Sequence, residues 1–476
     1  MRADLVIVGA GPAGMAAAQV AAGYGLRVTV IDEQARAGGQ LLRQPPATFQ
    51  VDRWLTHRIY RPQQRLLRAC PRLENVQWQH GTTVLGTDIA PDGIRLYLNG
   101  PGGVSKLAAK RLLLATGCHD MPVSFPGSTL PGVMATGGIQ AFIKSQHIVP
   151  GERFVFSGSH PLQLVVADQV LRAGGDVAAV LFSQPRAIFR QLLRQGLTIL
   201  RHPQKMLYFS HICAHLLRLG VPIHFGQVVS SARGDSCLRQ VSISSSEDLR
   251  QLDTVACDRL GIGFGFLANS QLASQLGARC QWSDTAGGWL ACADSWMRSS
   301  IPRVYVAGEI TGIGGADVSQ REGVLAGLAV AMDADSLAPD LAKRHASRPR
   351  RELRALYGFA TLLSTLSHPG QPLLSALMTP ESILCKCEEV SAGEALAVLK
   401  DNPFTADLNA LKLQSRCGMG LCQGRYCQYQ LRTLLALQRD AVTFAGEGFQ
   451  SRFPVKPVSI GALAAMPAAD DRQCKK

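Results

Sequence analysis

The pattern of apolar and polar positions predicts short buried strands that alternate with helices. A largely apolar stretch at 4–8 ends in glycines, an alanine-rich run follows at 15–23, and another apolar stretch covers 27–31. Short apolar stretches bounded by glycine are typical of parallel strands buried on both faces by helices. Two later stretches, 111–114 and 304–306, fit the same sheet. The chain is therefore expected to be an α/β protein.

The glycines after the first strand follow the pattern G-x-G-x-x-G. In such a turn Gly9 makes the tight bend, Gly11 lets the backbone approach a pyrophosphate, and Gly14 lets helix and strand pack closely. Asp32 ends the next strand, where a carboxylate can accept hydrogen bonds from a ribose. Strand, turn, helix, strand and acid occur in that order, which predicts a bound dinucleotide. The other residues expected at this dinucleotide site are Pro12, Ala13, Glu33, Gly39, Gln40, Ala115, Thr116, Gly117, Gly308 and Glu309.

These elements resemble the two-dinucleotide-fold flavoproteins of the glutathione and thioredoxin reductase type, in which FAD lies across the first fold. In that family an aspartate after the late strand contacts the ribityl-phosphate region of the flavin. Glu309 stands at this place, one methylene longer. The alternative for Glu309 is an ordinary solvated acid at a strand end. The resemblance implies a Rossmann-like fold and FAD as a cofactor.

A second strand, helix and strand follow at 153–156, 164–173 and 176–182. Only Gly158 remains of the three glycines, and His160 and Gln163 occupy the other two places. A side chain at the middle place would obstruct a dinucleotide, so nicotinamide binding is disfavoured. His160 is either a catalytic base or a loop residue that fills the space of an absent ligand, and we favour the second. The chain has no C-x-x-C pair, so disulfide reduction is not expected.

Size and charge narrow the class of protein further. With 476 residues, 46% of them hydrophobic, the chain can form about two to four domains. The net charge of +14 comes mostly from scattered arginines without a nucleic-acid motif, which favours an acidic protein partner or a solvated surface over nucleic acid. No apolar run is long enough for a transmembrane segment. The protein is expected to be cytoplasmic, with any membrane association peripheral and made through its complex.

The thirteen cysteines are unevenly distributed, and five of them lie between Cys385 and Cys427. They form a C-x-C pair, Cys385 and Cys387, and then Cys417, Cys422 and Cys427 with four residues between successive members. Such a group can be buried apolar side chains, a zinc site or an iron-sulfur site. Zinc sites favour C-x-x-C knuckles, so four thiolates around a 2Fe-2S cluster fit better.

The cysteine segment resembles the 2Fe-2S domain of bacterioferritin-associated ferredoxin. It is closer still to the version fused to the flavoprotein subunit of heteromeric amine dehydrogenases, namely opine oxidases, D-hydroxyproline dehydrogenases and hydrogen cyanide synthase, and this resemblance spans most of the chain. Related domains usually end in C-x-x-C, which is missing here. We assign Cys385, Cys387, Cys422 and Cys427 as ligands, with Cys417 as the alternative.

The resemblance implies an electron-transfer subunit. A partner FAD amine-oxidase subunit would oxidise a C–N bond of an amino acid, opine or hydroxyproline, and electrons would pass through this chain toward a quinone or another acceptor. The resemblance also allows an FMN bound at a subunit interface and a small ferredoxin-like subunit in a hetero-oligomer. The sequence itself gives no signal for either. The alternatives are a self-contained NAD(P)H-dependent reductase of a ferredoxin-like partner and a non-enzymatic iron-sulfur accessory protein. No catalytic residue can be assigned.

The expected domain order interrupts the FAD-binding domain with the second fold. Residues 339–351, rich in Pro, Arg and Ser, are interpreted as a linker, followed by a helix at 352–366. The expected segments are an FAD-binding domain at 1–120 and 301–335, a central degenerate dinucleotide fold at 121–300, a linker and helical connector at 336–380, a small mainly helical 2Fe-2S domain at 381–440 and a tail at 441–476.

Overall fold

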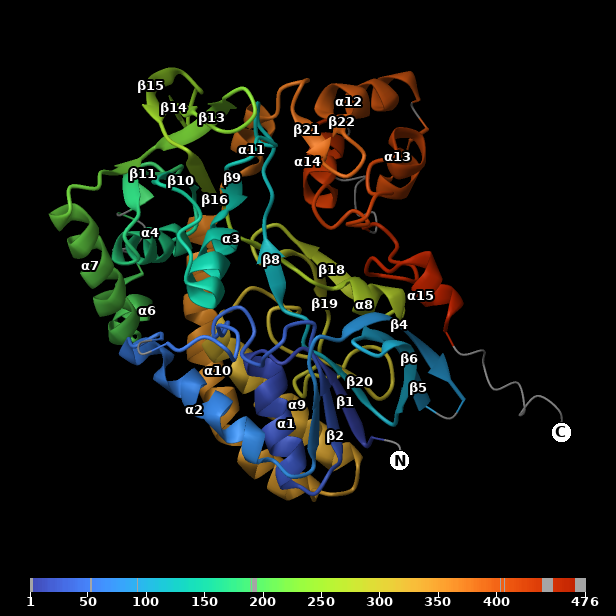
Figure 1. The fold of residues 1–476 in the computed structure, drawn as a ribbon. Coiled ribbons are helices and arrows are strands. Elements are labelled where there is room, and N and C mark those ends of the chain that lie inside the picture. Colours follow the sequence, from blue (N-terminus) through green and yellow to red (C-terminus); the bar gives the residue numbers. More distant parts are fainter. Residues whose placement is uncertain are drawn as a thin grey trace.

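The computed structural model places two parallel sheets side by side and a small helical domain beyond them (Figure 1). The described residues are 3–51, 54–91, 93–188, 190, 195–402, 404–405, 407–438 and 448–466. Cys474 lies outside them. No helix in this described part has the length and apolar character needed to cross a membrane.

The first sheet has five parallel strands in the order β20-β7-β1-β2-β3. The strands are β1 (Leu5–Val8), β2 (Val28–Ile31), β3 (Val76–Gln79), β7 (Leu112–Leu114) and β20 (Val304–Val306). Strand β20 comes from far along the chain and pairs with β7, so the late apolar stretch at 304–306 does join this sheet. Every residue of β1 is buried, as the continuous apolar run requires.

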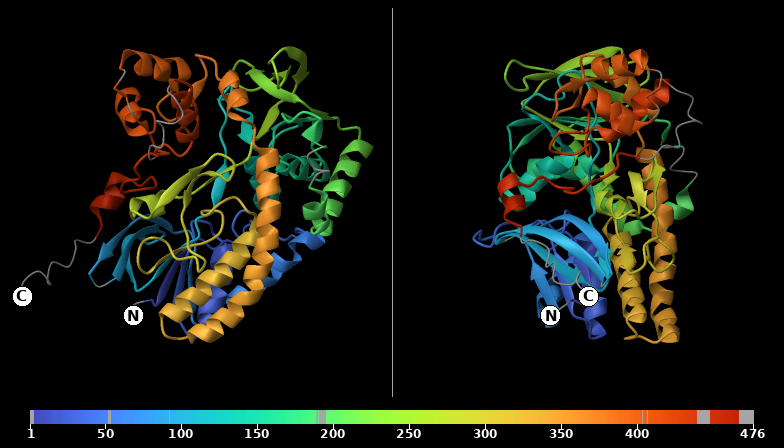
Figure 2. Two further views of the ribbon diagram at one scale, coloured as in Figure 1. Left: turned by 180° about the vertical axis from the view of Figure 1, so that it is seen from behind. Right: turned by 90° about the vertical axis from the view of Figure 1, so that its right-hand side faces the viewer.

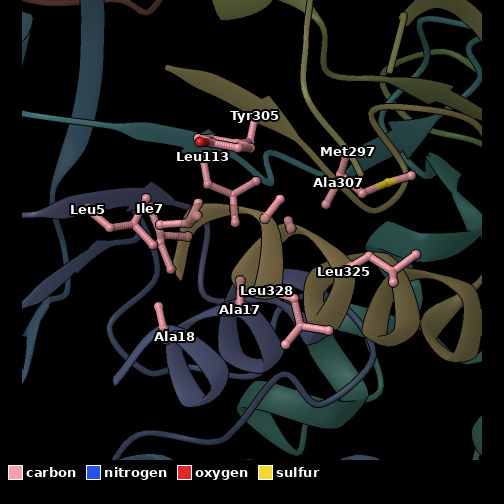
Figure 3. Packing of buried hydrophobic residues seen from close by; sticks show 14 of the residues in the cluster. Leu5, Ile7, Ala17, Ala18, Leu113, Met297, Tyr305, Ala307, Leu325 and Leu328 are labelled. Carbon is pink, nitrogen blue, oxygen red and sulfur yellow. The ribbon is translucent and has the colours of Figure 1, made fainter. Parts of the chain in front are cut away.

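Helices α1 (Pro12–Gly23) and α9 (Ala316–Asp333) cover one face of this sheet and pack closely on each other. Figure 3 shows Ala17 and Ala18 of α1 and Leu325 and Leu328 of α9 in the core beneath Leu5 and Ile7. Small residues allow the close approach, because a Cβ at Gly323 would lie 2.1 Å from the Ala13 carbonyl oxygen. This packing fixes the start of α1 relative to the turn after β20.

An antiparallel meander separates β3 from β7, and it consists of β4 (Thr83–Ala90), β5 (Gly93–Gly100) and β6 (Gly103–Ala109). A short helix α2 (Arg61–Ala69) lies before β3, between the 3-10 turns η1 (Arg58–Tyr60) and η2 (Cys70–Arg72).

The second sheet repeats the plan of the first, with five parallel strands in the order β12-β11-β10-β16-β9. Its strands are β9 (Val133–Ala135), β10 (Arg153–Gly158), β11 (Asp176–Phe182), β12 (Ile223–Phe225) and β16 (Arg259–Gly263). Its helices are α3 (Thr136–Ala141), the π-helical turn η3 (Phe142–Gln146), α4 (Leu162–Arg172), α6 (Gly196–Leu200) and α7 (Pro203–Arg218). A meander of β13 (Gln227–Arg233), β14 (Gln240–Ser245) and β15 (Gln251–Ala256) is inserted before β16.

Two crossing segments join the folds. Strands β8 (Cys118–Asp120) and β17 (Phe266–Ala268) pair antiparallel where the chain leaves and re-enters the first fold. Helix α8 (Gln271–Gln275) and the hairpin of β18 (Cys280–Ser283) and β19 (Gly288–Ala291) follow before β20.

The expected linker at 339–351 is wrong, because these residues begin a continuous helix, α10 (Pro339–Ser367), of 29 residues. Ala342, Ala346 and Leu353 are buried against the core that α9 also joins, and Pro349 lies inside the helix. Helix α10 runs along α9 and continues toward the second fold (Figure 2). Packing of an apolar face therefore outweighs the local preference for a break.

The C-terminal domain is mainly helical and lies at the upper right of Figure 1, and its Leu373, Leu374, Leu377 and Tyr429 are packed into the buried core of the second fold. Its elements are α11 (Gln371–Leu377), β21 (Ile383–Cys385), β22 (Val390–Ser391), α12 (Ala392–Asp401), α13 (Leu408–Ser415) and α14 (Gln428–Gln438). Helix α12 begins with a capping box between Ser391 and Glu394. The chain then returns to the first fold and ends its described part after α15 (Ile460–Ala464).

Candidate functional site

A cavity of about 850 Å³ lies along the carboxyl ends of the first sheet. In open α/β sheets this edge is where ligands bind. All the residues predicted for the dinucleotide line this cavity except Gly14, which is the third residue of α1. The structure thus brings together side chains that the sequence spreads from Gly9 to Glu309.

The backbone of the glycine turn at 9–14 is tightly packed against neighbouring carbonyl groups. Gly9 has φ of +107°, and a Cβ there would lie 2.3 Å from the Ala115 carbonyl oxygen. A Cβ at Gly14 would lie 1.9 Å from the Gly9 oxygen. Helix α1 begins after Gly11 with Pro12 in its first turn and without a side-chain cap. Its first backbone N–H groups are therefore available to the phosphates of a ligand in the cavity.

Asp32 is fixed at the end of β2 by two backbone donors. Its Oδ2 accepts from the Ala10 N–H at 2.6 Å and its Oδ1 from the Gln34 N–H at 2.7 Å. Burial raises the pKa of this carboxyl. The two bonds orient the carboxylate at the cavity wall, as a ribose-binding acid requires.

Glu309 is enclosed rather than solvated. The Cys118 thiol donates a hydrogen bond to its Oε2 at 2.8 Å, and burial raises the pKa of the carboxyl. The contact with Cys118 favours a site residue over an ordinary solvated acid at a strand end. The polar carboxyl faces the same cavity as Asp32.

The buried carboxylate of Glu322 fixes the turn that contains Glu309. Oε2 of Glu322 in α9 accepts from the Gly308 N–H at 2.7 Å and the Thr311 hydroxyl at 2.9 Å. Its Oε1 accepts from the Tyr357 hydroxyl of α10 at 2.6 Å. One side chain thus ties α9, α10 and the cavity turn together.

We expect the Glu322→Ala variant to be destabilised by roughly 2–4 kcal/mol, because three donors lose a buried acceptor. Tyr357→Phe removes a single donor and should cost only about 1 kcal/mol. Urea unfolding of both variants and their bound flavin content would measure the effect. Equal losses in the two variants would contradict a role for the Gly308 and Thr311 bonds.

In the second fold, the place of the middle glycine is filled by His160. The backbone N–H of His160 donates to the Gly263 carbonyl at 2.9 Å, and its ring Nδ1 accepts from the backbone N–H of Leu162 at 3.1 Å. Burial lowers the pKa of the imidazole to about 4. His160 is thus a neutral group in the loop, and it also lines the cavity of the first fold.

In the second fold, the loop after β11 is bonded to the end of α10. Gln184 is the second residue after β11, near the end of the strand where a ribose-binding acid would be expected. Its Nε2 donates to the Ser159 carbonyl at 2.7 Å and to the Leu366 carbonyl at 2.9 Å. Leu366 belongs to the last turn of α10. This helix end occupies the neighbourhood where a second nucleotide would need its ribose contact.

The C-terminal domain reaches the same cavity as the dinucleotide residues. Lys386, Arg425 and Tyr426 line it together with Gly9 and Asp32. His119 of β8 lies between the two parts. Its Nδ1 bonds to Oδ1 of Asn269 at 2.8 Å, and its Nε2 faces the Arg425 carbonyl at 3.3 Å. The cavity therefore extends from the first fold to the cysteine loop.

The five clustered cysteines converge in space. The thiols of Cys417 and Cys427 form hydrogen bonds with Cys385, which lower the pKa of Cys385 and raise those of the other two. Cys387 and Cys422 form a second contact. Cys385, Cys417 and Cys427 are buried, whereas Cys387 is exposed. The structure does not single out four of the five.

The donor chemistry of this group fits an iron-sulfur cluster, since thiolates are the ligands that such clusters use. Glycines make room for the loop, because a Cβ at Gly420 would lie 2.3 Å from that of Cys387. Within the described residues, however, no three His, Cys, Asp or Glu side chains already surround a common ion position. The cysteines are adjacent, but they form thiol contacts rather than a preformed coordination site.

Several cavity residues carry no signal in the sequence. Lys144 of η3 lines the cavity with its Nζ bonded to the Leu41 carbonyl at 3.1 Å, and burial lowers its pKa to about 7. Asp120 accepts from the Gly137 N–H at 3.0 Å, and burial raises its pKa to about 6. These residues and His119 sit outside any motif, so only the fold could identify them.

Fold and site together define an FAD-dependent oxidoreductase with two Rossmann-like sheets. The chain belongs to the pyridine nucleotide-disulphide oxidoreductase family, whose family model matches residues 3–323. Membership of this family implies FAD binding.

Curated relatives match nearly the whole chain. The HcnB subunit of hydrogen cyanide synthase from Pseudomonas aeruginosa is 33% identical over 472 residues, which are 96% of this chain and 97% of that protein. An opine oxidase subunit of Rhizobium meliloti (strain 1021) is 32% identical over 480 residues, 97% of this chain and 98% of that protein. Both relatives are named as subunits of larger enzymes.

Solved structures share the fold. L-proline dehydrogenase from P. horikoshii matches with a TM-score of 0.70 and 20% identity, covering 97% of this chain and 79% of that chain. Thioredoxin reductase of T. acidophilum matches with a TM-score of 0.53 and 18% identity, covering 70% of this chain and 99% of that chain. The first match includes the C-terminal domain, whereas the second covers a smaller share of the chain.

Proposed function

We propose that the protein is the electron-transfer subunit of a heteromeric amine or amino-acid dehydrogenase of the opine or hydroxyproline type, with FAD in the first fold and a 2Fe-2S cluster in the C-terminal domain. The observation that carries the proposal is the shared cavity, which is lined both by the dinucleotide residues and by Lys386, Arg425 and Tyr426. These three residues are close neighbours of Cys385, Cys387 and Cys427 in the chain. Two redox sites that share a wall can exchange electrons without crossing solvent.

Each part of the cavity has a defined task in this proposal. The α1 N–H groups and Asp32 would bind the phosphates and ribose of FAD, and Glu309 would lie on the side of its ribityl region. The flavin supplies two-electron chemistry and the cluster one-electron transfer. His119 holds the Arg425 carbonyl and thereby positions the cysteine loop against the cavity. We propose Cys385, Cys387, Cys422 and Cys427 as the ligands, with Cys417 as the alternative.

The substrate is oxidised in a partner protein under this proposal. The partner FAD amine-oxidase subunit would take a hydride from the carbon of a C–N bond, which leaves an iminium product, and the two electrons would pass through this chain to a quinone or another acceptor. The names of the hydrogen cyanide synthase and opine oxidase relatives support a heteromeric complex. An interfacial FMN and a small ferredoxin-like subunit are predictions from the resemblance, and a cytoplasmic or peripheral membrane location is a prediction from the sequence. The domain boundaries at 120, 300, 335, 380 and 440 are part of the same proposal.

The experiment that tests this function compares the isolated chain with its complex. The chain is purified with its co-purifying partners, and reduction of an artificial electron acceptor is followed with proline, hydroxyproline and opine substrates. We expect turnover by the complex and none by the isolated chain, because no base for amine oxidation is assigned to it.

Three outcomes would contradict the relay function. Full-rate amine oxidation by the isolated chain would place the chemistry here rather than in a partner. Rapid bleaching of the flavin by NADH or NADPH would favour the self-contained reductase, against the filled positions at His160 and Gln184. Flavin and cluster that exchange no electrons in a redox titration would favour the accessory protein.

A further inference from the structure

The segment that follows the C-terminal domain contacts both candidate redox sites. We define residues 448–459 as the C-terminal strap, which descends from the helical domain to α15 beside the β4–β6 meander (Figures 1 and 2). Nothing in the sequence motifs pointed to it.

At its first end the strap packs under the cysteine loop. The ring of Phe449 is buried, and it lies so close to Gly418 and Gly424 that a Cβ at these glycines would be 2.7 and 2.1 Å from ring carbons. The N–H of Gln450 donates to Oδ1 of Asn409 in α13 at 3.2 Å, which fixes this end to the domain. Phe449 thus forms the floor of the loop that carries Cys417, Cys422 and Cys427.

At its other end the strap closes part of the dinucleotide cavity. Nζ of Lys456 lies 2.8 Å from Oε2 of Glu33, the residue after Asp32. The N–H of Val455 donates to the Leu85 carbonyl of β4 at 2.7 Å. Val455 and Lys456 both line the cavity.

A direct bond links the strap to the cysteine loop between these ends. Nε2 of Gln423 donates to the Pro454 carbonyl at 2.5 Å. Gln423 stands between Cys422 and Gly424 and has φ of +51°, so the backbone of the loop is tightly bent where it meets the strap. One short segment therefore holds the floor of the loop, its bend and the cavity wall.

We propose that the strap couples the two sites, so that a dinucleotide in the cavity and a closed cysteine loop stabilise each other. Phe449, Gln423 and Lys456 are the positioning residues of this coupling. It goes beyond the electron-relay function and rests only on FAD binding, not on the presence of a cluster. Because such coupling is reciprocal, a change at one end must be measurable at the other. Local opening of the loop is the event that the strap restrains.

The test uses the full-length chain after treatment with a chelator and a reductant, so that its result does not depend on whether the cysteines carry iron. Two rates are measured: alkylation of Cys417 and Cys427 by N-ethylmaleimide, resolved by mass spectrometry, and dissociation of FAD, followed by flavin fluorescence. In the unmodified chain, saturation with FAD should slow alkylation of both cysteines by about fivefold or more.

Two variants test the coupling directly. Each changes one end of the strap, and the rate is measured at the other end. Lys456→Gln removes a cation beside the cavity and should speed alkylation of Cys417 and Cys427 by about fivefold. Phe449→Ala removes the floor of the loop and should speed FAD dissociation by a similar factor. The matched control is Lys110→Gln, which breaks another ion pair of the first fold, also at 2.8 Å, but away from the strap. It should change neither rate.

The coupling is overturned if FAD leaves the alkylation rates of the unmodified chain unchanged, which requires no variant to fold. It is also overturned if Lys456→Gln changes only FAD dissociation. Failure of the relay function would show instead in the electron-transfer assays, where neither of these rates is measured.

Discussion

Replacing Gly11 by alanine should leave a folded protein that binds FAD about a hundredfold more weakly, which corresponds to roughly 2.7 kcal/mol. Gly11 has φ of −77°, which alanine adopts readily, and the nearest atom to an added Cβ is the Gly39 Cα at 3.9 Å. The protein itself can therefore accommodate the methyl group. A pyrophosphate that approaches the backbone at this point could not.

Flavin titration of the apoprotein would measure the affinity for FAD, and the thermal unfolding temperature would show whether the fold is intact. Gly23→Ala is the matched control, since it lies at the other end of α1 with no atom within 4 Å of an added Cβ. It should keep full affinity. Gly14→Ala should instead impair folding, because its Cβ would overlap the Gly9 oxygen. Unchanged FAD affinity in Gly11→Ala would contradict the assigned binding mode.

Replacing Cys422 or Cys427 by serine should abolish the iron, the labile sulfide and the visible absorption of the proposed cluster. A serine hydroxyl is a poor substitute for a thiolate ligand of iron. Cys417→Ser should retain the absorption under the favoured ligand set. The measurements are anaerobic purification, visible spectroscopy and iron and sulfide analysis.

The control for this series is Cys257→Ser, which alters a buried cysteine of the second fold. It should keep the cluster. Loss of absorption in Cys417→Ser together with its retention in Cys427→Ser would replace the favoured set by one that contains Cys417. Wild-type protein that contains flavin but neither iron nor sulfide would remove the cluster from the proposal.

Local patterns predicted the first fold well, because its requirements are local. The tight turn at Gly9, the start of α1 and the acid at Asp32 follow one another within a single strand-helix-strand unit. The family match and the solved structures confirm the two-sheet α/β class. The 2Fe-2S domain and the site assignments stay predictions.

The linker interpretation of 339–351 was wrong because it relied on local composition. The helix that forms there is stabilised by contacts with other parts of the fold. Some charged positions of α10 have partners, as in the ion pairs of Glu352 with Arg321 and Arg348. Its apolar positions are buried against the first fold. Neither effect can be read from a local window.

The extent of the cavity could not be predicted for a similar reason. His119, Lys144 and Lys456 reach it from three separate segments, and each looks like an ordinary polar residue in the sequence. Only the pairing of β8 with β17 and the return of the C-terminal strap bring them to one place.

The end of α10 has a consequence for anyone who would re-engineer this chain to run on a nicotinamide coenzyme. Restoring glycines at positions 160 and 163 would reopen the turn but leave the carbonyl of Leu366 bonded to Gln184. The same helix carries Tyr357, whose hydroxyl donates to Glu322. A change that moved α10 would therefore also disturb the turn at Gly308 through Tyr357 and Glu322.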